Sequence, residues 1–140
     1  MEITVNYLAV LFAAVANMAL GFLWYGPLFG KVWMKLKGYS KEDLKKEQKQ
    51  MGKYYAISFV VALITGYMLS HVMALSTAFY GYPAIQTGLT SGLSMWLGFV
   101  MPVQVTATIF GDKKWKLLSI DTGYQLVGLL VMGVVIGFLG

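Results

Sequence analysis

The chain has 140 residues, of which 58% are hydrophobic and only 12% are charged. Because about a quarter of the residues in an ordinary soluble domain are charged, this composition excludes such a domain and indicates an integral membrane protein. The formal net charge of +5 comes from lysine without any arginine, and the absence of cysteine excludes disulfides and thiolate metal sites.

The first apolar run extends from about residue 3 to residue 25. As a helix it is long enough to cross a hydrocarbon core of roughly 30 Å, and it is too long for a signal-peptide core, so we expect a retained first span. Small or polar residues recur at every fourth position, as is typical of close helix packing. These residues are Ala9, Ala13, Asn17 and Gly21. Asn17 is then either a hydrogen-bonding group between helices or a ligand-binding residue.

This span ends at aromatic residues that are followed by lysines, a pattern typical of the membrane interface. Gly26-Pro27 is predicted to stop the helix. Between residues 28 and 37, apolar and lysine positions separate onto two helix faces, which predicts a short helix lying in the interface. The predicted lipid-interface residues are Trp24, Tyr25, Lys31, Trp33 and Lys35, with Trp115 in a later loop.

The second long helix is predicted to begin at Ser40, which forms a capping-box pattern with Asp43, after Gly38 ends the interfacial helix. The loop 26–54 contains eight lysines and should stay in the cytoplasm. The second span, about 55–78, has small residues at every fourth position from Ser58 to Ala74. His71, the sole histidine, is either a proton relay or a neutral hydrogen-bonding group between helices.

The third and fourth spans are predicted at about 85–110 and 117–139. An uncharged connection over 79–84 makes the second and third spans an outer hairpin. The third span contains a GxxxG pattern at Gly88 and Gly92, and then Pro102, which is predicted to kink it. The loop 111–116 contains three lysines and should again be cytoplasmic. Gly133 and Gly137 repeat the small-residue spacing in the fourth span.

These elements predict an all-α polytopic membrane protein in which residues 1–140 form a single membrane domain. It would contain four transmembrane helices plus a cytoplasmic interfacial helix. The positive-inside rule predicts a multi-pass protein of the inner (plasma) membrane with both termini outside and the lysine loops in the cytoplasm. Because four short helices have little interior, the small-residue stripes also predict a homo-oligomer.

The two halves of the chain show a weak internal similarity. Leu20-Gly-Phe22 and Pro27 are echoed by Leu97-Gly-Phe99 and Pro102. Such halves would be parallel repeats related by an axis along the membrane normal. The alternative is a chance likeness between two membrane exits.

Two stretches carry a resemblance to a known family. Residues 21–34 contain Trp-Tyr-Gly-Pro-Leu-Phe-Gly-Lys-Val-Trp, and residues 110–124 contain Phe-Gly-Asp-Lys-Lys-Trp. Together they resemble domain-of-unknown-function family 1761, which comprises small membrane proteins of bacteria and fungi. The resemblance implies a four-span architecture over nearly the whole chain, and it implies no activity.

Asp121 is the only acidic residue within a predicted span. A charge in lipid costs at least about 2.5 kcal/mol unless it is paired, hydrated or buried in protein. It is therefore either an ion or proton site, together with Asn17, Gln104 and Gln125, or an interfacial charge neutralised by nearby lysines. One histidine without cysteine cannot complete a typical zinc or di-iron site, so we predict no metal and no cofactor.

The leading functional hypothesis is a small oligomeric transporter or channel for a small solute or ion. Its candidate ligand-binding residues are Asn17, His71, Gln104, Asp121 and Gln125. The alternative is a non-transporting scaffold or regulatory subunit that binds anionic lipid or a protein partner through its lysines. We find no nucleophile or metal set that favours an enzyme. Nucleic acid is not an expected partner, because the lysines adjoin membrane segments.

Overall fold

The computed structural model describes residues 5–111 and 113–140, and this part of the chain contains helices and no strand. Two short π-helical segments, η1 and η2, interrupt the α-helices. In chain order the elements are α1 (Tyr7–Leu23), η1 (Trp24–Leu28), α2 (Gly30–Lys37), α3 (Lys41–Tyr80), α4 (Ala84–Met95), η2 (Trp96–Val100), α5 (Met101–Phe110) and α6 (Trp115–Leu139).

Four helical stretches are long and apolar enough to cross a membrane, and they confirm the predicted all-α polytopic fold. They are Tyr7–Leu28, Lys41–Tyr80, Ala84–Phe110 and Trp115–Leu139. Large apolar side chains such as Phe12, Ile64 and Phe99 remain exposed along them. An apolar surface of this extent suits lipid, not water. The predicted start of the first span at residue 3 lies outside the described residues.

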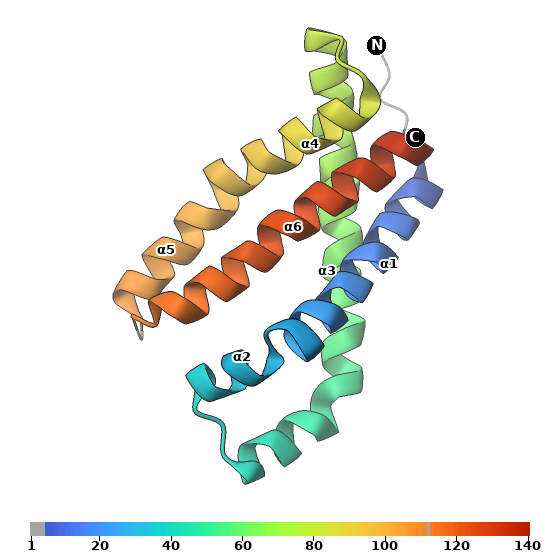
Figure 1. The fold of residues 1–140 in the computed structure, drawn as a ribbon. Coiled ribbons are helices and arrows are strands. Elements are labelled where there is room, and N and C mark those ends of the chain that lie inside the picture. The colour runs from blue at the N-terminus through green and yellow to red at the C-terminus, as the bar shows by residue number, and fades with distance from the viewer. Residues whose placement is uncertain (1–4, 112) are drawn as a thin grey trace.

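Helix α6 lies at the centre of the bundle (Figure 1). The continuous line of α4, η2 and α5 runs antiparallel along one side of α6, α1 packs on another side, and α3 crosses behind. Leu69, Met132 and Ile136 are among the buried residues of the core. The two ends of the described chain meet, because Asn6 Nδ2 donates to the Leu139 carbonyl oxygen at 3.1 Å.

The predicted small-residue stripes pack against other helices of the same chain. The backbones of Gly88 in α4 and Gly133 in α6 touch, so that a Cβ on either glycine would meet the carbonyl group of the other. A Cβ at Gly92 would lie 2.9 Å from the Leu129 carbonyl oxygen. On α1 and α3, Ala13 and Gly66 are buried as well. Since these stripes are largely covered within the chain, although Ser58 is exposed, they argue less for a homo-oligomer, which remains a prediction.

The sequence predicted that the first helix stops at Gly26-Pro27, but the structure differs. The helix continues through η1, where the Phe29 N–H donates to the Trp24 carbonyl oxygen at 2.8 Å. Proline lacks an N–H and its ring needs space beside the preceding turn, which the wider π turn supplies. The third span also has a π segment beside its proline. The segment η2 lies just before Pro102, and the Met101 N–H donates to the Trp96 carbonyl oxygen.

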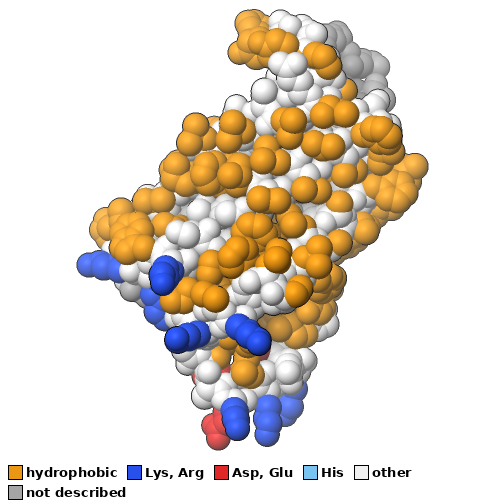
Figure 2. Space-filling view, in the orientation of Figure 1, with side chains coloured by type: hydrophobic (Ala, Val, Ile, Leu, Met, Phe, Trp, Pro, Cys, Tyr) orange, Lys and Arg blue, Asp and Glu red, His pale blue; other side chains and the backbone are white. Residues whose placement is uncertain are grey.

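The predicted end of the interfacial helix and the predicted start of the second long helix are confirmed. Gly38 has a left-handed conformation (φ 71°) at the end of α2. Ser40 and Asp43 form the capping box of α3, with hydrogen bonds of 3.0 and 3.1 Å. With 40 residues, α3 is roughly 60 Å long, about twice the hydrocarbon thickness. Its lysine-bearing first turns therefore extend beyond the apolar part, and Figure 2 shows lysines gathered at that end.

Candidate functional site

Three aromatic side chains hold one turn of α6, and we call them the aromatic clasp: Trp24, Tyr25 and Trp96. Trp24 Nε1 donates to the Ile120 carbonyl oxygen at 3.0 Å. The Tyr25 hydroxyl donates to Asp121 Oδ1 at 2.7 Å, and Trp96 Nε1 donates to the Thr122 carbonyl oxygen at 2.8 Å. A carbonyl oxygen has two lone pairs, so each indole can add a second hydrogen bond to a carbonyl within a helix. Three successive residues of α6 are thereby held from two sides.

The two tryptophans of the clasp occupy the same place in their π segments. Trp24-Tyr-Gly26 opens η1 and Trp96-Leu-Gly98 opens η2, and each tryptophan carbonyl accepts a hydrogen bond from the N–H five residues later. This correspondence pairs Trp24 with Trp96. The internal similarity in the sequence pairs Gly21 with Gly98 instead. It therefore aligns the two halves of the chain differently from the π segments. The repeated Trp-x-Gly pattern was the sequence signal that could have identified the clasp.

The predicted lipid-interface residues separate into two groups. Trp24 and Tyr25 are half-buried, and their polar atoms contact α6. Trp33 is also half-buried, with its ring 5.5 Å from that of Tyr25. The exposed members are Lys31, Lys35 and Trp115. The exposed group therefore still suits an interface, while the half-buried aromatics connect α1 and α2 to α6.

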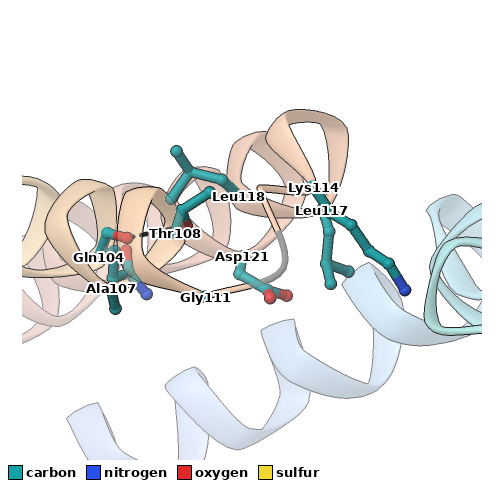
Figure 3. A pocket seen from close by; sticks show the side chains of 8 residues that line it. All are labelled: Gln104, Ala107, Thr108, Gly111, Lys114, Leu117, Leu118 and Asp121. Carbon is teal, nitrogen blue, oxygen red and sulfur yellow. Dashed lines mark hydrogen bonds between the residues drawn. The ribbon is translucent and has the colours of Figure 1, made fainter.

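A pocket of about 300 Å³ lies between α5 and the start of α6 (Figure 3). It brings together two of the predicted site residues, Gln104 and Asp121, which are 17 positions apart in the chain. Its other lining residues are Ala107, Thr108, Gly111, Lys114, Leu117 and Leu118. This volume is at the lower end of the range for small-molecule sites, roughly 300 to 1,000 Å³.

The pocket is lined by one carboxylate, that of Asp121, and by the amide, hydroxyl and ammonium groups of Gln104, Thr108 and Lys114. Asp121 accepts a hydrogen bond from the neutral Tyr25 hydroxyl, and a carboxylate can accept several more. Gln104 Oε1 is buried and has no hydrogen-bond partner among the described residues. An unpaired buried acceptor costs free energy, which a donor from a ligand would recover. Lys114 Nζ donates to the Leu36 carbonyl oxygen at 2.7 Å, and Figure 3 shows its side chain extending away from Gln104.

The other predicted ligand-binding residues do not line this pocket. Asn17 lies at the crossing of α1 and α6, where a Cβ at Gly128 would be 2.5 Å from its Oδ1. Its carbonyl oxygen accepts a hydrogen bond from the Tyr124 hydroxyl at 3.2 Å. Gln125 is exposed on α6. His71 lies on α3, with Nδ1 3.1 Å from the Tyr67 carbonyl oxygen.

Replacing Trp96 with phenylalanine should lower the free energy of unfolding by at least about 1 kcal/mol, the usual net effect of one hydrogen bond. Phenylalanine is smaller than tryptophan, so the loss combines the indole N–H bond to Thr122 with the packing of the indole against the buried core. Unfolding in mixed micelles with increasing dodecyl sulfate measures this difference. Trp115→Phe is the matched control, since Trp115 is 53% exposed. Equal losses in the two variants would show that the Trp96 bond does not stabilise the fold.

These features define a helical membrane-protein class with four potential spans, in which two π segments present tryptophans to a central helix beside a small polar pocket. A family model described as "Protein of unknown function (DUF1761)" matches residues 8–137, and the chain belongs to this family. The comparisons found no match among curated proteins and none among solved structures.

Proposed function

We propose that this protein binds a small solute bearing an ammonium group in the pocket between α5 and α6 and takes part in its transport across the membrane. The observation that carries the proposal is the position of Asp121. Its carboxylate belongs to a helix apolar enough to cross a membrane, yet it lines a pocket together with the unpaired Gln104 Oε1. An ammonium group offers N–H donors and a positive charge, which match these acceptors.

Access to this pocket would be from the end of the bundle that carries the lysines. Gly111 and Lys114, from the turn between α5 and α6, line that side of the pocket. Toward the other end, the Gly88–Gly133 contact holds α4 directly on α6. Complete passage therefore requires α4 or α5 to move relative to α6. The π segment η2 lies between α4 and α5, and π turns are frequent at functional sites in helices.

The test is uptake of radiolabelled methylammonium into proteoliposomes with an inside-negative potential. Asp121→Asn keeps an oxygen that can accept the Tyr25 hydrogen bond, but it removes the charge that we propose to bind the ammonium. We expect uptake to fall at least about tenfold, equivalent to about 1.4 kcal/mol. Gln125→Leu, on the same helix but outside the pocket, should transport like the wild type. Equal uptake by wild type and Asp121→Asn would contradict the proposal.

A second candidate function follows from the lysines at one end of the molecule (Figure 2). This end would face the cytoplasm by the positive-inside rule and bind anionic lipid headgroups, each lysine near the surface contributing about 1 kcal/mol. Replacing the exposed Lys31 and Lys35 with glutamine should reduce the phosphatidylglycerol retained on purification. Unchanged retention, measured by lipid mass spectrometry, would exclude this role for α2.

A further inference from the structure

A second pocket, of about 480 Å³, lies between the η1–α2 segment and the lysine-bearing start of α3. It is separate from the Asp121 pocket, and the two share no lining residue. Tyr25 connects them, because its ring lines the second pocket while its hydroxyl donates to Asp121. Three half-buried aromatic residues, Tyr25, Trp33 and Tyr39, form part of the wall, and we call them the aromatic cage.

Within the aromatic cage, the Trp33 ring stands nearly at right angles to each of the two tyrosine rings. The Trp33 ring makes an interplanar angle of 71° with Tyr25 and 81° with Tyr39, at centroid separations of 5.5 and 5.8 Å. Trp33 is thus in edge-to-face contact with both tyrosines, and all three residues line the same pocket. The faces of Trp and Tyr rings attract cations within about 6 Å, and such cages bind quaternary ammonium groups.

Two observations bear on cation binding at this pocket. Lys37 does not line the pocket, but its ammonium lies 5.4 Å from the Trp33 ring centroid, so this ring already attracts a cation. Of the described residues that line the pocket, Glu47 is the only charged one, so the pocket has a negative charge that could attract a cation. Met34 and Met51 also line it, and methionine side chains adapt readily to apolar groups of different shape.

We infer that the second pocket binds a quaternary ammonium group attached to an apolar or aromatic body, with the cation at the aromatic cage near Glu47. The chemistry differs from that of the Asp121 pocket. A quaternary ammonium has no N–H to donate, so rings and a carboxylate suit it better than the amide and hydroxyl acceptors around Asp121. The inference is thus independent of the proposed transport of an ammonium-bearing solute.

The test compares benzyltrimethylammonium with neopentylbenzene, its uncharged analogue of nearly the same shape. Binding of each probe to the purified full-length protein in detergent is measured by saturation-transfer NMR and calorimetry. Benzyltrimethylammonium should bind at least about tenfold more tightly than neopentylbenzene. The neutral probe loses the cation–π attraction to the rings and the electrostatic attraction to Glu47. Equal affinities would overturn the inference.

Three variants locate the binding. Trp33→Leu and Glu47→Gln should each weaken benzyltrimethylammonium binding about fivefold to tenfold. Glu47→Gln changes no ring packing, so it keeps the test valid if Trp33→Leu fails to fold. Glu42→Gln, on the same helix but outside the pocket, is the matched control and should bind like wild type. If Glu47→Gln and a folded Trp33→Leu both bind like wild type, the inference is wrong.

A quaternary ammonium could come from a phosphatidylcholine headgroup or from a free solute. Nanodiscs of phosphatidylglycerol mixed with phosphatidylethanolamine are therefore compared with nanodiscs in which phosphatidylcholine replaces the phosphatidylethanolamine, so that the surface charge is the same. Weaker probe binding in phosphatidylcholine identifies the lipid headgroup as an occupant, and unchanged binding identifies a free solute. Either result supports the inference if Glu47→Gln weakens binding in the same discs. Binding that Glu47→Gln does not affect in either disc overturns it.

Discussion

Replacing Gly133 with valine is expected to prevent α4 and α6 from packing together, with a loss of about 3 kcal/mol or more in the free energy of unfolding. The backbones of Gly133 and Gly88 touch in the structure, so any side chain forces the helices apart. Separation also breaks the neighbouring contact of Gly92 with Leu129. Helix association in lipid depends on such close packing, because the surrounding lipid is as apolar as the helix surface.

Alanine variants measure the same contact more finely. Gly88→Ala and Gly133→Ala should each destabilise the protein, and the double variant should cost less than the sum, because the first Cβ already separates the helices. Gly52→Ala is the control, since nothing lies within 4 Å of a Cβ there. Unfolding of Gly133→Ala within about 0.5 kcal/mol of wild type would contradict the described contact.

Replacing Tyr25 with phenylalanine is expected to cost about 2 kcal/mol, since hydrogen bonds to charged groups contribute more than neutral ones. The variant keeps the ring but removes the hydroxyl that donates to Asp121 at 2.7 Å. The carboxylate would lose a donor that orients it, so methylammonium uptake should also fall several-fold. Equilibrium unfolding measures the loss of stability, and the uptake assay measures the loss of transport.

Tyr124→Phe is the matched control for Tyr25→Phe. The Tyr124 hydroxyl donates to the uncharged Asn17 carbonyl at a longer distance of 3.2 Å, so its loss should cost about 1 kcal/mol or less. A double-mutant cycle of Tyr25→Phe with Asp121→Leu, whose side chain has no acceptor, isolates the pairwise energy. A coupling energy near zero would show that the Tyr25–Asp121 hydrogen bond does not stabilise the protein.

Features determined by local sequence were predicted well. The capping box of Ser40 and Asp43 and the left-handed Gly38 involve only neighbouring residues, so their patterns identify them directly. The GxxxG pattern at Gly88 and Gly92 likewise indicated a close helix contact. It could not identify Gly133 as the partner, because the choice among four small-residue stripes depends on how all the helices pack together.

The candidate site was predicted only in part. Gln104 and Asp121 line one pocket, whereas Gln125, one turn beyond Asp121, is exposed. Which turn of α6 is covered depends on its neighbours, and helical spacing does not contain that information. Trp24 was assigned to the lipid interface because tryptophan beside lysine is typical there. Its place at the interface remains a prediction, and its indole also donates to α6, a contact between residues 96 positions apart that local sequence could not indicate.

The central claim, that Asp121 itself binds an ammonium group, is tested most directly by infrared difference spectroscopy of the purified protein with and without methylammonium. Wild type should show a shift of a carboxylate stretching band on addition of methylammonium, and Asp121→Asn should lack that band shift. The same difference spectrum in both proteins, or no carboxylate change in wild type, would contradict the claim.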